Sequence, residues 1–340
     1  MIYRSKAPLR IGLAGGGTDV SPYSDLYGGA ILNATVSLSA YASIEPLEAS
    51  TIIVETLDRK EIQTFETMPV LPINGSLDLL KGVYNRIQAQ FGVPLKGFKL
   101  STYVDAPAGS GLGTSSTLVV AILGAFVELL KLPLGDYDIA HLAYQIERED
   151  LLLAGGKQDQ YAATFGGVNF MEFYGEDQVI VNPLRIRPEY LHELGNNLVL
   201  YFTATSRESA AIIKEQVKNV QDKNSGSIEA MHQLKEQAKM MKEALLRGRL
   251  HEIGEILDFG FEQKRKMAHN ISNTNIEAIY DAAKKAGATG GKISGAGGGG
   301  FMIFYCPGNT RHAVIETLNT FGGEIKNYSF TKYGLTTWTI

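Results

Sequence analysis

The printed sequence predicts an α+β protein built from two domains. Strand-like and helix-like segments follow one another in mixed order along 340 residues, and 44% of these are hydrophobic, enough for one large core or two medium ones. The most apolar helical segment, residues 118–130, directly follows a glycine-rich loop. A segment bounded by Pro183 and Pro188 separates the two halves, so we expect domains at residues 1–185 and 186–340.

In the first half, runs rich in β-branched and aromatic residues predict strands at residues 30–38, 41–47, 51–54, 61–65 and 98–104. We expect antiparallel pairing among them. Apolar residues at helical spacing predict two helices that cover one face of this sheet. The first follows an N-cap at Ser76 and runs to Phe91, and the second is capped by Asp136 and reaches Asp150.

The second half begins after a predicted hairpin at residues 168–173 and 178–181. A strand at residues 197–203 should open the second domain, followed by a helix at residues 206–220. Residues 228–246 form a long amphipathic pattern whose apolar face consists of Met231, Leu234, Ala238, Met241 and Leu245. Since methionine commonly fills irregular gaps in a core, this face is interpreted as core packing.

Composition excludes several classes of protein. A net charge of −4 argues against a protein that coats nucleic acid, and the longest apolar run is too short to span a bilayer. A single cysteine, Cys306, cannot form an internal disulfide, and the first residues contain no apolar run typical of a signal peptide. We therefore expect a cytoplasmic protein with neither nucleic acid nor a membrane as partner.

Three glycine-rich loops carry the functional signal, at residues 15–17, 105–117 and 290–300. The middle loop leads straight into the apolar helix, and a helix N-terminus preceded by glycines favours a bound phosphate. The Walker pattern fails, because Gly291-Lys292 is followed by isoleucine. Glycines 295, 297 and 300 match a dinucleotide fingerprint in spacing only, because an apolar strand follows where that fold requires a helix.

The three loops, in this order, resemble the motifs of the GHMP small-molecule kinases. The matching segments are Ala7-Pro-Leu-Arg10 with Gly15–Asp19, then Pro107–Ser116, then Lys292–Phe301, so the resemblance spans nearly the whole chain. Leu13–Asp19 and Gly156–Gly167 are most similar to the D-glycero-D-manno-heptose 7-phosphate kinases. The resemblance implies a ribosomal-protein-like N-terminal domain with a mixed sheet and a ferredoxin-like C-terminal domain.

The resemblance also implies ATP and Mg²⁺ as cofactors. The triphosphate would lie on the middle loop, with contacts from Pro107, Gly109, Ser110, Gly111, Leu112, Gly113, Thr114, Ser115 and Ser116. By the same match, Mg²⁺ would be held by the Ser115 hydroxyl and the Glu147 carboxylate. Glu149 remains an alternative to Glu147, although residues two apart on a helix point to different faces.

For catalysis, the resemblance assigns Asp159 as the base and Arg10 as its partner. A carboxylate can accept the proton of the attacking hydroxyl late in a loose phosphoryl-transfer transition state, because positioning and electrostatics lower most of the barrier. Arg10 would hold Asp159 as a carboxylate and polarise that hydroxyl.

Substrate contacts are expected from the first and third glycine loops and from two cationic residues between them. Galactokinase has Glu-His where this chain has Gly16-Gly17, which leaves space for a longer sugar. Lysine and arginine side chains should bind a substrate phosphate, and Lys6, Lys157 and Arg207 are candidates, Arg207 being preferred. The full set of expected substrate residues is Gly17, Thr18, Asp19, Lys157, Arg207, Gly297 and Gly298.

The implied reaction is transfer of the ATP γ-phosphoryl group to the anomeric hydroxyl of a sugar phosphate, with D-glycero-D-manno-heptose 7-phosphate as the expected substrate. Two alternatives stay open: an anomeric kinase of an unphosphorylated sugar such as fucose or an N-acetylhexosamine, and a non-catalytic sugar sensor. The sequence also leaves a homodimer open.

Overall fold

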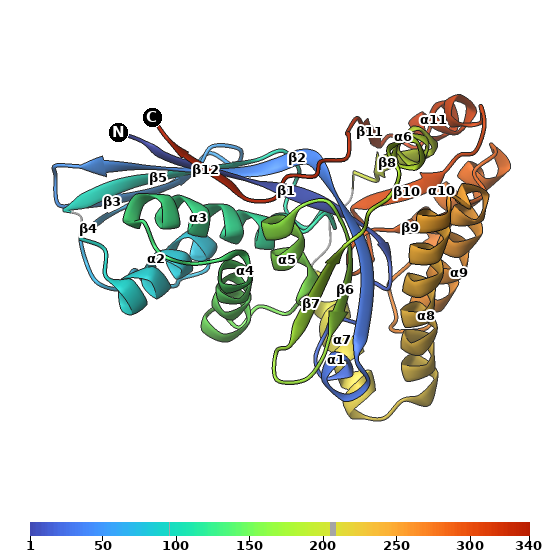
Figure 1. Cartoon of the computed structure of the whole chain (residues 1–340), viewed down its shortest axis with the longest axis horizontal. Helices are drawn as coiled ribbons and strands as arrows, with labels where there is room; N and C mark the ends of the chain where they lie inside the picture. Colours follow the sequence, from blue (N-terminus) through green and yellow to red (C-terminus); the bar gives the residue numbers. More distant parts are fainter. Residues whose placement is uncertain (95, 205–208) are drawn as a thin grey trace.

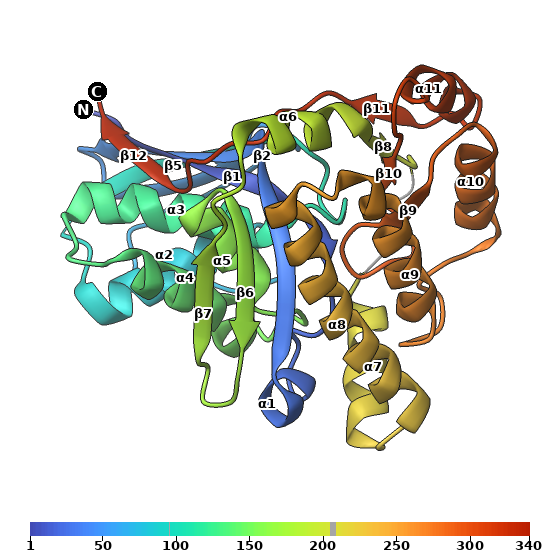
Figure 2. The same ribbon diagram turned by 45° about the vertical axis from the view of Figure 1, so that its right-hand side comes forward.

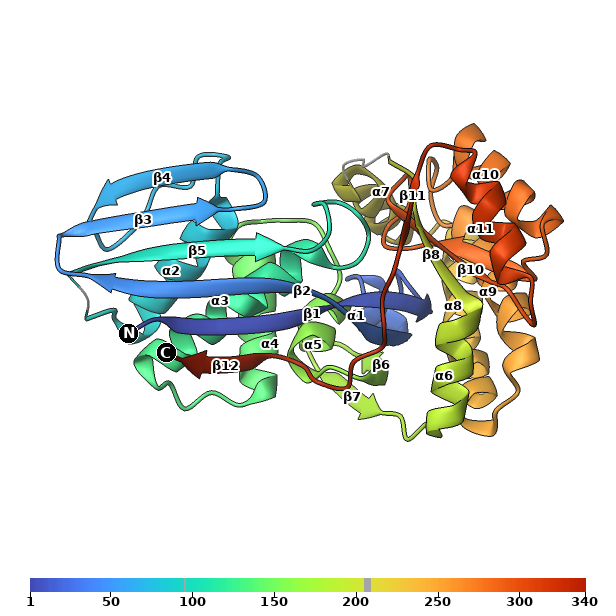
Figure 3. The ribbon, with the colours of Figure 1, turned by 90° about the horizontal axis from the view of Figure 1, so that it is seen from above.

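The computed structural model describes residues 1–94, 96–204 and 209–340. Its strands form an eight-stranded sheet in the N-terminal half and a four-stranded sheet in the C-terminal half, and the two lie at opposite ends of an elongated molecule (Figures 1 and 3). The predicted α+β fold with two sheet-based parts is confirmed.

The N-terminal sheet is built around two long strands, β1 (Tyr3–Ala14) and β2 (Gly29–Leu47), which pair antiparallel. Its order is β12-β1-β2-β5-β3-β4, and a hairpin of β6 and β7 extends from β2. The remaining strands are β3 (Thr51–Thr56), β4 (Glu61–Glu66), β5 (Gly97–Val104), β6 (Val168–Phe173), β7 (Val179–Pro183) and β12 (Thr336–Thr339). Because β3 and β5 run parallel, the sheet is mixed.

Helices pack against one face of this sheet. The apolar run predicted from the sequence forms α3 (Thr114–Leu130), which is buried against β1 and β2. α2 (Asp78–Phe91) and α4 (Asp136–Gln145) pack on α3, and a π-helical turn at Ile146–Asp150 continues α4. α1 (Tyr23–Tyr27) follows β1, and α5 (Gln158–Phe165) lies between α3 and α4. These helices support the loops that enter the cavity described below.

The C-terminal sheet has the order β11-β8-β10-β9, and every pair in it is antiparallel. Its strands are β8 (Leu198–Phe202), β9 (Gly290–Ile293), β10 (Phe301–Tyr305) and β11 (Glu324–Lys326). Counted from β8, this is the order 4-1-3-2 of a ferredoxin-like split βαβ unit, as the sequence resemblance implies. The helices are α6 (Pro188–Asn197), α7 (Ser209–Gln221), α8 (Ser225–Arg247), α9 (Ile253–Arg265), α10 (Thr274–Lys285) and α11 (Arg311–Asn319), with a short 3₁₀ turn at Leu250–Glu252.

The two halves share an apolar core and one strand. A single cluster joins Leu9 and Ile11 of β1 to Met241 of α8 and Phe301 of β10, and Figure 2 shows α8 lying beside the long strand β2. The C-terminal strand β12 returns to pair with β1. The domain boundary at residue 185 stays a prediction. The strands of the C-terminal sheet all follow it in the chain, but the last strand, β12, belongs to the N-terminal sheet.

Several local predictions were wrong. β1 was not predicted, the segments 30–38 and 41–47 form one continuous strand, and β3 pairs parallel with β5. α4 is capped at Gly135, whose amide donates to the Asp138 carboxylate at 2.9 Å, instead of at Asp136. The long C-terminal helix α8 and its methionine-rich core face were predicted correctly.

Within the described ranges, no helix combines the length and the apolar character needed to cross a membrane.

Candidate active site

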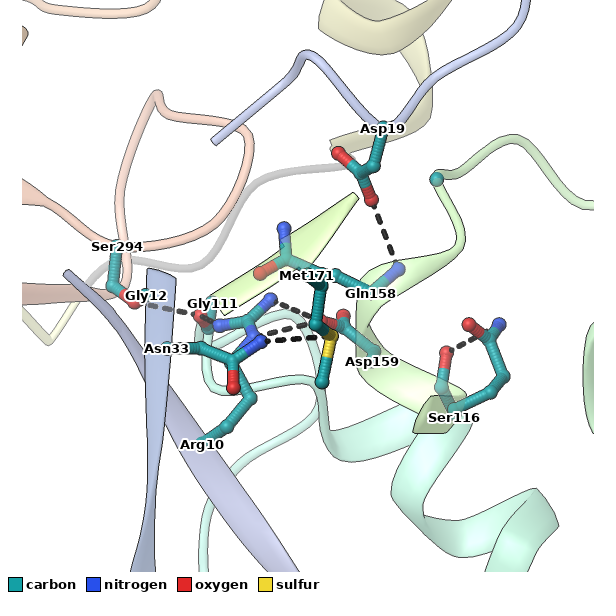
Figure 4. Close-up of polar contacts among 12 residues, drawn as sticks. Arg10, Gly12, Asp19, Asn33, Gly111, Ser116, Gln158, Asp159, Met171 and Ser294 are labelled. Atoms are coloured by element: carbon teal, nitrogen blue, oxygen red, sulfur yellow. Dashed lines mark hydrogen bonds and ion pairs between the residues drawn. The ribbon is translucent and has the colours of Figure 1, made fainter. Parts of the chain in front are cut away.

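The second and third glycine loops meet between the two sheets. The Ser294 hydroxyl donates a hydrogen bond to the Gly111 carbonyl at 2.8 Å (Figure 4). The Phe301 amide donates to the Ser110 carbonyl, also at 2.8 Å. A Cβ on Gly295 would lie 2.7 Å from the Gly111 Cα. Only glycine permits this approach, so backbone contact between the loops depends on the glycines that mark both motifs.

A cavity of about 290 Å³ opens beside this contact. All three glycine loops contribute to its wall, together with the segment that leads into α5 and side chains from the C-terminal helices. Its polar and charged lining residues are Arg10, Asp19, Thr114, Ser115, Ser116, Glu147, Arg148, Gln158, Asp159, Gln216, Lys264 and Lys292. Residues from positions 10 to 296 therefore share one site.

Arg10 and Asp159 form a charged pair in the cavity wall. Nε and Nη2 of Arg10 both lie 2.6 Å from Oδ1 of Asp159, while Nη1 donates to the Gly111 carbonyl. Figure 4 shows the guanidinium between Gly111 and the carboxylate. The Arg10 side chain is 5% exposed and that of Asp159 is 22% exposed, so the carboxylate keeps a face toward the cavity.

The position of Asp159 depends on the middle glycine loop, residues 105–117. Asp159 lies in the first turn of α5. A Cβ on Gly113 would come within 3.0 Å of the Asp159 Cγ, and Gly113 has a φ of +76°. Glycine at 113 thus allows the loop and the carboxylate to lie in contact.

Ser115 and Glu147 face the cavity from adjoining helices. Ser115 is exposed in the first turn of α3, and Glu147 is buried on the π-helical turn after α4. Gln160 donates to Glu147 and to the Ser116 hydroxyl, which ties the two helices together. Burial raises the pKa of the Glu147 carboxyl, and the nearby Arg148 partly opposes this shift. Glu149 is exposed and outside the cavity lining, so of these two glutamates it is Glu147 that faces the cavity.

Asp19 is the other buried carboxylate of the cavity. It accepts a hydrogen bond from the Gln158 amide at 3.0 Å, and a Cβ on Gly156 would fall 1.9 Å from its Oδ2. Burial raises the pKa of Asp19, and the charge of Asp159 adds to the effect. Asp19 therefore lines the cavity on the side formed by the first glycine loop and the segment before α5.

Two other predicted substrate residues, Thr18 and Lys157, bind groups of the protein itself. The Thr18 hydroxyl lies within hydrogen-bonding distance of the Gly15 carbonyl in its own turn and of the Ala30 carbonyl on β2, and it accepts a hydrogen bond from the Ala30 amide. Lys157 is buried beside Asp177 at 2.9 Å and Asp25 at 3.6 Å, and it is not among the cavity residues.

The glycines of the third loop divide between two surroundings. Gly297 and Gly298 contact Ile271, whereas Gly295 and Ala296 line the cavity. Arg207, the preferred phosphate ligand, lies outside the described residues.

Two cavity lysines, Lys264 and Lys292, were not predicted. Their side chains are 2% and 5% exposed, and the Lys292 ammonium donates to the Gly12 carbonyl at 2.9 Å. A signal was present for Lys264, which occupies the apolar face of α9 in helical register with Leu257 and Phe261. Lys292 begins the third glycine motif, but the direction of its side chain, toward the Gly12 carbonyl at the end of β1, is set by contacts between distant segments.

Comparison with known proteins explains this arrangement. Residues 78–167 match the GHMP kinases N terminal domain, and residues 241–324 match the GHMP kinases C terminal domain. A curated D-glycero-alpha-D-manno-heptose 7-phosphate kinase from Campylobacter jejuni is 46% identical over 99% of both chains. This chain is a GHMP kinase. As a member of that family it is an ATP-dependent phosphotransferase.

Other relatives agree with the family assignment. A crystal structure described as a D-glycero-D-manno-heptose 1-phosphate kinase from Bacteroides thetaiotaomicron superposes with a TM-score of 0.85, 46% identity and 99% coverage of each chain. An L-fucokinase/L-fucose-1-P guanylyltransferase from Bacteroides fragilis is 28% identical over 87% of this chain, which spans 34% of that longer protein. A Lactococcus lactis galactokinase shares the fold at a TM-score of 0.77 and 19% identity.

Proposed function

We propose that this GHMP kinase transfers the γ-phosphoryl group of ATP to the anomeric hydroxyl of D-glycero-D-manno-heptose 7-phosphate, giving the 1,7-bisphosphate. The observation that carries the proposal is the Arg10–Asp159 pair in a cavity lined by all three glycine loops. The heptose substrate is supported by the 46% identity to a heptose 7-phosphate kinase over nearly the full length of both chains.

In this proposal the middle glycine loop, residues 105–117, acts as a phosphate loop and binds the triphosphate together with α3. Residues 109–116 present glycine backbone and hydroxyl groups at a helix N-terminus, and among the described side chains none caps that first turn. Amides at a helix N-terminus favour negative charge, so the transferred phosphoryl group would be stabilised as its charge spreads.

Asp159 is the proposed base and Arg10 its positioning cation. Asp159 accepts the proton of the attacking sugar hydroxyl while the oxygen bonds to phosphorus and ADP leaves. Arg10 fixes the carboxylate through two nitrogens and is itself fixed by the Gly111 carbonyl. Such alignment supplies most of the catalysis in phosphoryl transfer.

Mg²⁺ is proposed as the metal that accompanies ATP. One buried carboxylate and one exposed hydroxyl in the same cavity fit a cation that keeps phosphate oxygens and waters as its other ligands. Glu147 and Ser115 would hold it, and the metal would neutralise phosphate charge. Gln160 orients Glu147 for that role.

Asp19 is proposed to bind sugar hydroxyls on the side of the cavity formed by the first glycine loop and the segment before α5. Its buried carboxylate accepts one backbone hydrogen bond from Gln158 and lines the cavity. A buried carboxylate that hydrogen-bonds a substrate hydroxyl strongly rejects an analogue that lacks this hydroxyl, because the carboxylate is then left unpaired.

The cytoplasm, where sugar phosphates and ATP are available, is the proposed location.

A coupled ADP-release assay over sugars with and without a terminal phosphate tests the function. We expect turnover that requires Mg²⁺ and is highest with the heptose 7-phosphate, and a ³¹P NMR spectrum of the product with a new phosphate on the anomeric carbon. Higher turnover with fucose or an N-acetylhexosamine would favour the unphosphorylated substrate class, and phosphate transfer to another carbon would refute the anomeric acceptor.

A further inference from the structure

Two buried lysines face the cavity from the C-terminal half, Lys264 on α9 and Lys292 on β9. They come together at Gly16, in the turn after β1. A Cβ placed on Gly16 would lie 3.6 Å from the Lys264 Nζ and 3.9 Å from the Lys292 Nζ. The two ammonium groups therefore flank one point in the cavity, on the turn that also carries Asp19.

These cations are not neutralised by the protein. In the portion of the chain that the structure describes, neither lysine forms an ion pair with a carboxylate, and Asp19 acts on Lys264 only at longer range. Burial lowers the pKa of Lys264 to about 8, and burial together with the charge of Lys264 lowers that of Lys292 well below its usual value. Burying two positive groups side by side is costly unless an anion joins them.

Two cations of the N-terminal half, Arg10 and Lys157, are already engaged. Arg10 is held by Asp159 at the reaction centre, and Lys157 lies beside Asp177 and Asp25 away from the cavity. Among the described cavity residues, Lys264 and Lys292 thus combine burial, proximity to each other and freedom from carboxylate partners.

We propose that Lys264 and Lys292 form the binding site for the phosphate that the sugar already carries, and so select a phosphorylated sugar. The inference deepens the proposed function and rests on it. A sugar whose acceptor hydroxyl faces Asp159 and whose ring hydroxyls face Asp19 would extend its far end toward Gly16. The absence of a side chain at Gly16 leaves room for phosphate oxygens between the two ammonium groups.

The decisive measurement compares Lys264→Met and Lys292→Met with the wild-type enzyme on paired substrates. With the heptose 7-phosphate, we expect KM to rise about 10- to 100-fold in each variant, since each loses one charged hydrogen bond to phosphate. KM for ATP and turnover of the unphosphorylated heptose should stay within about twofold of wild type. Lys266→Met is the matched control, because Lys266 is an exposed lysine next to α9 and outside the cavity lining.

The rival ligand for the pair is the γ-phosphate of ATP. If it binds there, the variants raise KM for ATP or lower turnover equally with both sugars, and the proposal is overturned. An unchanged KM for the heptose 7-phosphate would overturn it as well. Lys292→Arg is the control for loss of folding. It keeps the positive charge, so it should restore the sugar-phosphate binding that Lys292→Met loses.

A binding experiment separates this inference from the proposed function. Calorimetry without ATP, using mannose 6-phosphate and inorganic phosphate as probes, should show heat of binding in the wild type that Lys264→Met removes. If no sugar is phosphorylated but phosphate binding still depends on Lys264, the function fails and the site stands. If turnover of the heptose 7-phosphate is normal and phosphate binding is unaffected by both variants, the site fails and the function stands.

Discussion

The two halves of the cavity treat positive charge differently. On the N-terminal side, Arg10 is bound to Asp159 and Arg148 lies 3.8 Å from Glu147, so each of these two cavity cations has a carboxylate of the protein beside it. On the C-terminal side, Lys264 and Lys292 lie together at Gly16, and no described residue gives either of them such a partner. A paired cation positions another protein group, whereas an unpaired buried cation is suited to an anion that arrives with the substrate.

The largest effect on activity is expected from the N-terminal pair of Arg10 and Asp159. Asp159→Asn should lower kcat by about 10²- to 10⁴-fold, since it removes the proposed base while keeping the size of the side chain. KM for both substrates should change little. ADP release under saturating substrates is the measurement, with Asp281→Asn on the exposed surface of α10 as the control. A kcat within threefold of wild type would remove Asp159 from the reaction.

The next largest effect on kcat is expected at Gly113, which allows the middle glycine loop to lie in contact with Asp159. Gly113→Ala should lower kcat by about 100-fold, because the new Cβ would lie 3.0 Å from the Asp159 Cγ at a φ of +76°. Gly92→Ala is a matched control, since Gly92 has a φ of +72° but nothing within 4 Å of its Cβ position. Equal losses of activity in both variants would assign the effect to backbone strain alone.

The role of the two C-terminal lysines can be tested by placing a carboxylate beside them. Gly16→Glu places an acid beside Lys264 and Lys292, and we expect KM for the heptose 7-phosphate to rise about 10- to 100-fold. The unphosphorylated heptose should be affected less, so the ratio of kcat/KM values shifts toward it. Gly16→Ala is the control, because its Cβ makes only ordinary contacts at 3.6 Å and 3.9 Å. An unchanged ratio would contradict the assignment of this point to phosphate.

The smallest expected effect is on pH dependence. A bound phosphate favours charged Lys264, whose free pKa is about 8, so affinity is greatest below that value and falls as pH rises through it, by up to about tenfold per unit. Arg10 opposes protonation of Lys264 and Asp19 favours it, while the charge of Lys264 lowers the pKa of Lys292, so these neighbouring charges set the midpoint. KM for the sugar phosphate measured from pH 7 to pH 9 tests this. Lys264→Met should flatten the profile, and an unaltered slope would exclude Lys264 as its source.

The sequence predicted features that depend on neighbouring residues in the chain. Glycines at fixed spacing before an apolar run indicated the phosphate loop and α3, and the stripe from Met231 to Leu245 indicated the core face of α8. Local steric freedom and side-chain periodicity suffice for such features. The resemblance of the three motifs added the two-domain kinase fold and the family, both of which are confirmed.

Only the tertiary structure decided which charges meet. Lys157 and Lys264 are both lysines in helical or loop context, yet one lies beside acidic residues and the other enters the cavity. Likewise β12, at the end of the chain, pairs with the strand that carries Arg10. These outcomes depend on the packing of segments that are far apart in sequence, and no local pattern fixes the distance or orientation at which such segments come together.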